Sequence, residues 1–163
     1  MYARPFIDSL EFAKSSQQIA GNVQSVELPR LQDVLENQDG VLSYTIKGGV
    51  DSSGHSFIDL SVRGALQLQC QRCLELLDYS VVHEARLLLC DQDDLEKLDD
   101  EAEIESILAD PKLDVLNLLE EEIVLSLPIS PRHEQGTCRL AGTEGEIGAV
   151  RNSFAILEQL KRS

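Results

Sequence analysis

The feature that most constrains the fold of this chain is a run of alternating residues near its middle. Apolar side chains and one glycine occupy every second position from Ile58 to Cys70, with mostly polar side chains between them. Only an extended strand satisfies a period of two over so many residues. The alternation returns from Leu77 to Leu89. We therefore predict a long antiparallel hairpin over about residues 57–89, with Cys70-Gln-Arg-Cys73 at its tip.

Shorter elements are predicted before this hairpin. Residues 5–14 have the pattern of a short helix, and a second helical segment is expected from Pro29 to about Asn37, because proline favours the first turn of a helix. Residues 41–50 alternate and predict a further strand.

A longer helix is predicted after the hairpin. Asp114 can cap it, and its apolar stripe consists of Leu116, Leu119, Ile123 and Leu127. The predicted fold class is therefore α+β, an antiparallel sheet centred on the long hairpin with helices packed on one face. The pattern leaves open whether the sheet curves into a partial barrel. A chain of 163 residues is expected to form a single domain, residues 1–163.

Negative charge is concentrated in one segment. The chain carries a net charge of −15, and residues 91–122 hold 14 acidic and 2 basic side chains. The composition of about residues 91–111 predicts a flexible acidic loop with at most a weak helical turn near Ile107. We expect the carboxylates of residues 120–122 to be solvated. An acidic segment repels phosphate, so it serves either solubility or the docking of a basic partner such as a ribosomal protein.

The C-terminal part reads as a polar linker, about residues 134–150, before a short helix. No segment has the length and apolarity of a transmembrane helix, and the first residues lack the apolar core of a signal peptide. We expect a cytoplasmic protein with no membrane partner. In that reducing compartment a Cys-x-x-Cys pair favours metal binding or redox chemistry over a structural disulfide.

Four residues are candidates for one metal site. A tight Cys-x-x-Cys turn can supply two of the four thiolate or imidazole ligands that zinc prefers, and His133 and Cys138 can complete the set. The candidate ligands are thus Cys70, Cys73, His133 and Cys138. His83 and Cys90 occupy apolar positions of the second strand and are expected to be core residues instead.

Two other interpretations of the thiols stay open. Cys70 can simply pack inward at the end of its strand while the other three residues are incidental. Cys70 and Cys73 can also form a thiol-disulfide redox pair. The redox interpretation is weaker because a thioredoxin-type pair opens a helix, whose N-terminus lowers the thiol pKa, whereas this pair lies between strands.

Three arginines accompany the candidate ligands. Arg72 lies inside the thiol pair, Arg132 precedes His133 and Arg139 follows Cys138. Guanidinium groups suit phosphate through bidentate hydrogen bonds, so these are the candidate RNA contacts. The alternative is that they pair with carboxylates of the chain itself.

The sequence argues against an enzyme. It contains no Gly-x-x-x-x-Gly-Lys-Ser/Thr, Gly-x-Ser-x-Gly or Gly-x-Gly-x-x-Gly motif. A zinc ion with four protein ligands would also leave no open position for a water nucleophile. We expect no small-molecule substrate.

Several segments together resemble a known family. They are Leu68–Leu74 at the hairpin tip, the acidic helix Asp114–Pro128, Pro131-Arg132-His133 with Cys138, and the closing Asn152–Lys161. In this order they resemble the bacterial YceD family, the large ribosomal RNA subunit accumulation proteins. The four candidate metal ligands match positions of its motif.

The resemblance implies a non-enzymatic factor for the synthesis, processing or stability of 23S ribosomal RNA in large-subunit assembly. Its partners would be 23S rRNA precursor, basic ribosomal proteins, or both. The alternatives are a thiol-disulfide redox protein and an acidic interaction scaffold for a basic ribosomal protein.

Overall fold

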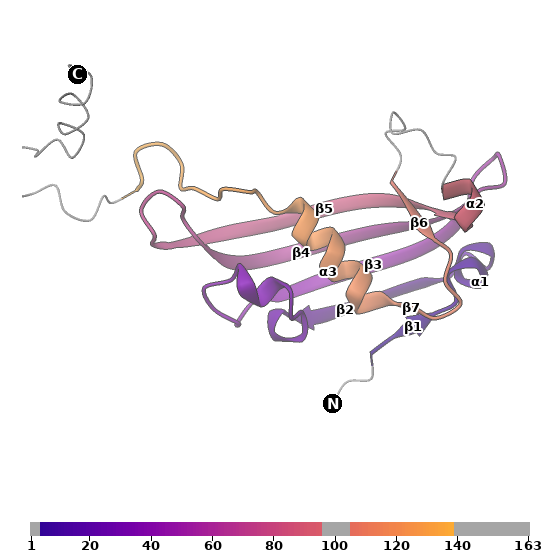
Figure 1. Ribbon diagram of the computed structural model, residues 1–163. Helices are drawn as coiled ribbons and strands as arrows, with labels where there is room; N and C mark the ends of the chain where they lie inside the picture. The colour runs from indigo at the N-terminus through magenta and orange to yellow at the C-terminus, as the bar shows by residue number, and fades with distance from the viewer. Residues whose placement is uncertain (1–3, 96–104, 139–163) are drawn as a thin grey trace, which may run out of the picture.

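The long hairpin lies at the centre of a five-stranded sheet in the computed structural model, which describes residues 4–95 and 105–138 (Figure 1). The strand order is β2-β3-β4-β5-β6, and the predicted α+β class is confirmed. The sheet is open rather than a closed barrel, since β2 and β6 are its two edges within the described residues. The strands are β2 (Gln18–Gln24), β3 (Val41–Val50), β4 (Ser56–Gln69), β5 (Leu76–Cys90) and β6 (Ser106–Leu108).

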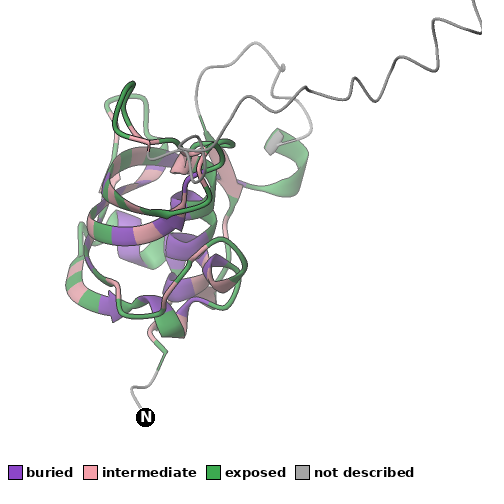
Figure 2. Cartoon of the chain, turned by 90° about the vertical axis from the view of Figure 1, so that its left-hand side faces the viewer, coloured by how far each residue is buried: buried purple, intermediate pink, exposed green. Residues whose placement is uncertain are grey.

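The predicted hairpin is confirmed in its extent and in the position of its tip. β4 and β5 pair antiparallel from Phe57 opposite Leu88 to Gln69 opposite Leu76. This register leaves residues 70–75 as the connecting turn, so both thiols of the Cys-x-x-Cys lie at the tip. Buried and exposed bands alternate along the strands, as a period of two requires (Figure 2).

The strand β2 was not predicted from the sequence. Its outward residues are polar apart from Ala20, and its inward residues are Ile19, Gly21 and Val23, which is too little apolar character to stand out. β2 is a strand because β3 pairs with it along its whole length. Gly21 is required by close packing, since a Cβ there would lie 2.9 Å from the Tyr44 hydroxyl oxygen across the strand pair.

Two short helices near the N-terminus differ from prediction. The helix expected over residues 5–14 begins only at Ser9 (α1, Ser9–Lys14), because β1 (Phe6–Ile7) pairs with β7 (Leu113–Asp114) in a separate two-stranded sheet. The segment from Pro29 contains a single 3-10 turn, Leu31–Asp33, and a second such turn lies at Ser25–Glu27.

Helix α3 (Val115–Ser126) covers one face of the sheet, as predicted (Figure 1). Asp114 caps it, because the Asp114 carboxylate accepts hydrogen bonds from the backbone N–H groups of Leu116 and Asn117 at 3.0 and 3.2 Å. Leu119 and Ile123 are fully buried against the sheet, and α1 adds Phe12 and Ala13 to the same core. The predicted layering of helices on one face is confirmed.

The acidic segment contains a strand that the sequence did not predict. Ser106–Leu108 forms β6, which pairs parallel to β5, instead of a weak helical turn. A short helix, α2 (Gln92–Leu95), precedes it. The rest of the predicted acidic loop, residues 96–104, lies outside the described residues.

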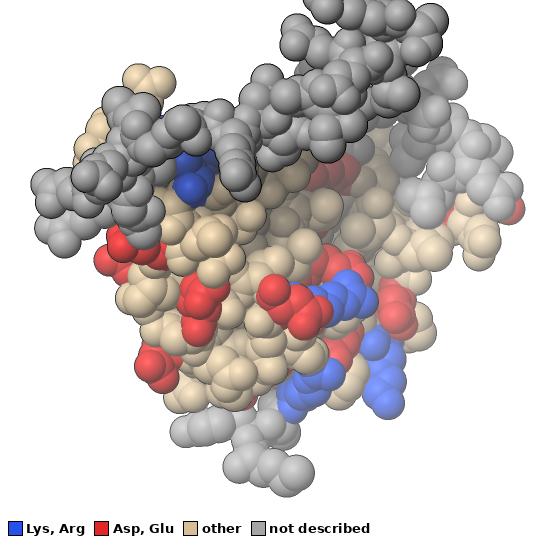
Figure 3. Space-filling view, turned by 60° about the vertical axis from the view of Figure 1, so that its left-hand side comes forward, with Lys and Arg blue, Asp and Glu red and all other residues tan. Residues whose placement is uncertain are grey.

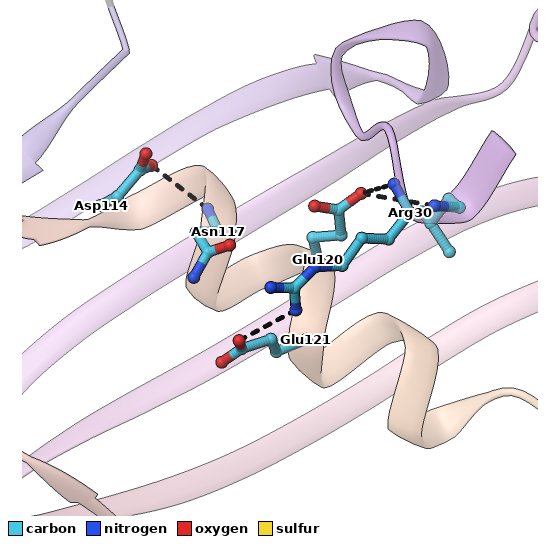
Figure 4. Close-up of polar contacts among 6 residues, drawn as sticks. Arg30, Asp114, Asn117, Glu120 and Glu121 are labelled. Atoms are coloured by element: carbon cyan, nitrogen blue, oxygen red, sulfur yellow. Dashed lines mark hydrogen bonds and ion pairs between the residues drawn. The ribbon is translucent and has the colours of Figure 1, made fainter.

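The expectation that the three carboxylates of α3 are solvated is wrong for two of them. Glu120 and Glu122 are buried, with exposed fractions of 2% and 5%. Glu120 accepts hydrogen bonds from the backbone N–H groups of Arg30 and Leu31, and only Glu121 lies at the surface, paired with the Arg30 guanidinium at 3.0 Å (Figure 4). Burial is tolerated because each buried carboxylate has a hydrogen-bond donor.

The C-terminal expectations fall mostly on residues that the structure does not describe. The predicted short helix, Arg139 and the linker beyond Cys138 all lie there. Among the residues described, no helix has both the length and the apolar character needed to span a membrane.

Candidate metal centre

The turn at the hairpin tip is shaped by its own backbone. The Cys70 N–H donates to the Glu75 carbonyl at 2.9 Å, and the Leu74 N–H donates to the Cys70 carbonyl at the same distance. Leu74 has φ +61, in the left-handed region that non-glycine residues rarely adopt. This tight turn carries the side chains of Cys70 and Cys73 to the same side, and we call residues 70–76 with 131–138 the knuckle.

A second segment, about sixty residues further along the chain, lies against this turn. The Gln71 N–H donates to the Pro131 carbonyl at 2.8 Å, and Arg72 Nη2 donates to the His133 carbonyl at 3.1 Å. These contacts follow directly after α3, which ends at Ser126 and is succeeded by Pro128 and Pro131. The prolines cannot continue the helix, so the chain runs extended toward the hairpin tip.

The four predicted ligands meet in one cluster. Their ligand atoms lie within 4.8 Å of one another. Cys70 Sγ is 3.6 Å from Cys138 Sγ, and His133 Nδ1 is 3.4 Å from Cys73 Sγ and 3.6 Å from Cys138 Sγ. With Zn–S bonds of about 2.3 Å and Zn–N bonds of 2.0–2.1 Å, the edges of a tetrahedron are roughly 3.8 Å for S···S and 3.6 Å for S···N. The three separations given are close to these edges, so the cluster could be occupied as a Cys3His site.

The orientation of His133 suits a ligand bound through Nδ1. Its other ring nitrogen, Nε2, lies 2.9 Å from the Leu76 carbonyl oxygen. A carbonyl oxygen only accepts hydrogen bonds, so Nε2 carries a proton, which leaves Nδ1 as the nitrogen that could bind a metal on the side of the sulfur atoms. Metal-binding histidines are commonly oriented by such a second hydrogen bond.

The thiols of Cys70 and Cys73 have their pKa values shifted in opposite directions. Burial raises the pKa of the Cys70 thiol, but the backbone N–H groups of Cys73, His133 and Arg72 more than offset burial and lower that pKa to about 5. For Cys73, the Glu75 N–H lowers the pKa, whereas burial and the neighbouring Cys70 and Cys138 sulfurs raise it, so its pKa lies above the ordinary value. Clustered thiols thus resist full ionisation until a cation joins them.

The donor set selects the kind of metal. Three thiolates and one imidazole are the ligands of structural zinc sites, and these residues would hold Zn²⁺ with all four positions filled.

The two residues predicted to belong to the core, His83 and Cys90, are not part of the cluster. Cys90 is buried, and His83 Nε2 lies 3.0 Å from a Glu122 carboxylate oxygen. The sequence could not show the contributions of the Leu76 carbonyl and the Gln71 N–H, because backbone groups leave no residue signature.

The described arginines lie exposed at the knuckle. Arg72 donates to a backbone carbonyl, and Arg132 Nε donates to the Ser130 hydroxyl at 3.3 Å. In the described part of the chain neither guanidinium forms an ion pair with a carboxylate. On the face shown in Figure 3, acidic side chains are scattered over the surface, and Lys and Arg side chains are fewer.

The fold and the site together define a small α+β protein with a Cys3His knuckle at the tip of its central hairpin. A model of the family "Large ribosomal RNA subunit accumulation protein YceD" matches residues 58–161, which include the hairpin, α3 and all four clustered residues. The chain belongs to the YceD family.

One curated relative carries the same name. The large ribosomal RNA subunit accumulation protein YceD of Haemophilus influenzae is 25% identical over 166 aligned residues, which cover 96% of this chain and 94% of that protein. No solved structure matches the chain.

Proposed function

We propose that this chain is a non-enzymatic cytoplasmic factor that supports the accumulation of large-subunit ribosomal RNA, and that it acts by binding precursor RNA through the knuckle. Family membership supports the coarse role, since the family is named for accumulation of that RNA. The observation that carries the binding role is the position of Arg72 and Arg132, exposed and without carboxylate partners among the described residues, beside the Cys3His cluster.

Zinc bound at the knuckle would have a structural role. Cys70 and Cys73 come from the hairpin turn, and His133 and Cys138 from the segment after α3, so one ion would join two parts of the chain far apart in sequence. The ion would offset two of the three thiolate charges and fix the backbone that carries the arginines. Because four protein ligands fill a tetrahedral shell, this site supports binding rather than catalysis.

Phosphate recognition follows from the guanidinium chemistry. Arg72 donates one N–H to the His133 carbonyl. This hydrogen bond holds the side chain in place and leaves further guanidinium donors exposed. Arginine donors in this fork arrangement suit the paired oxygens of a phosphate. The acidic segment, residues 91–122, would repel RNA, so this part of the chain would not compete with the knuckle for phosphate.

The test is UV cross-linking and pull-down of the tagged full-length protein at low and high salt, with the captured RNA sequenced. We expect enrichment of large-subunit precursor RNA that weakens as salt rises, because phosphate contacts release counterions. In the variant Arg72→Glu/Arg132→Glu we expect cross-linking to fall to background.

A control variant distinguishes loss of the knuckle arginines from the change in the net charge of the protein. Lys47→Glu/Arg63→Glu makes the same change in charge at exposed positions of β3 and β4 and should keep cross-linking. If the knuckle variant still cross-links, the arginines are not the contact. If the unchanged protein captures no RNA above background, the proposal of direct RNA binding is wrong.

A further inference from the structure

A second surface lies away from the knuckle, between α3 and the edge strand β6. Leu118, Glu121, Glu122 and Leu125 recur at helical spacing and form one side of α3, which faces Glu105–Ile107. Between these two walls is a groove of about 450 Å³, with Leu87 of β5 also lining it. A volume of this size lies within the roughly 300–1,000 Å³ of ligand clefts, so the groove can accept several side chains.

The walls of this groove expose apolar surface that the fold itself does not cover. Leu125 is 73% exposed and Val124 is 40% exposed, although both belong to the helix that covers the core. Leu118 and Leu87, by contrast, are almost fully buried and form the deeper part. Exposed apolar side chains beside a concave surface are typical of a docking site for another molecule.

The charge around the groove is predominantly negative. Three carboxylates line it, those of Glu105, Glu121 and Glu122, against the single guanidinium of Arg30. That guanidinium is already paired with Glu121 at 3.0 Å. Glu105, Glu121 and Glu122 belong to residues 91–122, the segment that carries most of the net negative charge of the chain. Phosphate or an acidic peptide would be repelled here, whereas a cationic ligand would be attracted.

We propose that the groove between α3 and β6 binds a segment of a basic protein that presents apolar side chains flanked by Lys or Arg. The apolar side chains would enter between Leu118, Leu125 and Leu87, and the cationic side chains would reach Glu105 and Glu121 at the rim. The binding surface shares no residue with the knuckle, so it stands independently of the RNA-binding role.

The test uses a fluorescent 16-residue peptide of leucine and lysine at helical spacing, with a counterpart in which glutamate replaces lysine. Anisotropy titrations of the full-length protein should show binding of the lysine peptide, weaker at high salt, and no binding of the glutamate peptide. Leu125→Asp and Glu105→Lys/Glu121→Lys should each weaken the lysine peptide by about tenfold or more.

Two further proteins make the test specific. Val82→Asp introduces a charge at another exposed apolar position, on the outer face of β5 and 67% exposed, and should bind the peptide like the unchanged chain. Cys70→Ser should do the same, since the knuckle takes no part.

Three results would overturn the proposal. The first is equal loss in Val82→Asp, which would show that the loss of binding is not specific to the groove. The second is binding unaffected by the groove variants. The third is a change of oligomeric state in Leu125→Asp by size-exclusion chromatography, which would assign the groove to a second copy of this chain.

Discussion

The knuckle and the core beneath α3 are held together by different forces. Under α3, Leu119 and Ile123 have no exposed surface and pack on the sheet in one apolar cluster. At the knuckle the neighbouring apolar residues Leu74 and Leu76 are 66% and 55% exposed, and order comes from backbone hydrogen bonds and the four clustered ligand atoms. Apolar burial therefore stabilises the sheet, whereas the knuckle depends on polar contacts and on the ion it would hold.

This difference implies two levels of stability in one chain. The hydrophobic effect acts on the core whether or not a metal is present. Apart from Cys70, the described residues of the knuckle lack such burial, and clustered thiols repel one another once ionised. Removal of metal should therefore loosen the knuckle before the sheet.

The largest expected effect on the free energy of unfolding is in the core. Leu119→Ala removes a fully buried side chain and should destabilise the sheet by about 2–5 kcal/mol. Leu125→Ala on the same helix, where the side chain is 73% exposed, should change stability by no more than about 0.5 kcal/mol. Urea denaturation followed by circular dichroism, with and without a chelator, measures both. Equal losses in the two variants would contradict the assignment of the buried face of α3.

A smaller effect is expected from the buried carboxylate. Glu120→Ala leaves the N–H groups of Arg30 and Leu31 without their acceptor and should cost about 1–3 kcal/mol. Glu121→Ala breaks only an exposed ion pair and should cost less than about 1 kcal/mol. The same denaturation experiment compares them, and a reversed order would show that the buried carboxylate does not tie α3 to the loop at Arg30.

The smallest effect on the sheet is expected at the knuckle. Cys70→Ser should abolish stoichiometric zinc, measured by native mass spectrometry, while the urea midpoint of the sheet stays close to that of the unchanged protein. Cys90→Ser, at a buried cysteine outside the cluster, should keep the zinc. Hydrogen exchange in Cys70→Ser should be faster at residues 70–76 and 131–138 and unchanged in the rest of the sheet. Collapse of the whole sheet on chelation would remove the distinction between the two regions.

Local sequence patterns predicted the elements whose structure depends on residues close together in the chain. The hairpin follows from the alternation of apolar residues, because successive side chains of a strand point to opposite faces. The cap at Asp114 and the buried stripe of α3 follow in the same way from helical geometry. The grouping of Cys70, Cys73, His133 and Cys138 could be predicted too, since thiol and imidazole are rare and chemically distinct side chains.

Tertiary structure decided what depends on residues far apart in the chain. β2 carries little apolar signal and β6 has only three residues, too few to show a period. Both are strands because β3 and β5 offer them hydrogen-bonding edges. Glu120 and Glu122 look like solvated residues in the sequence, yet they are buried because Arg30, Leu31 and His83 supply donors from other elements. The sequence by itself determined the hairpin, the capped helix and the chemistry of the ligands. The two halves of the knuckle lie far apart in the sequence, so only the fold could bring them together. Only the fold could also bury two carboxylates, because a buried carboxylate needs hydrogen-bond donors, and here these come from other elements of the chain.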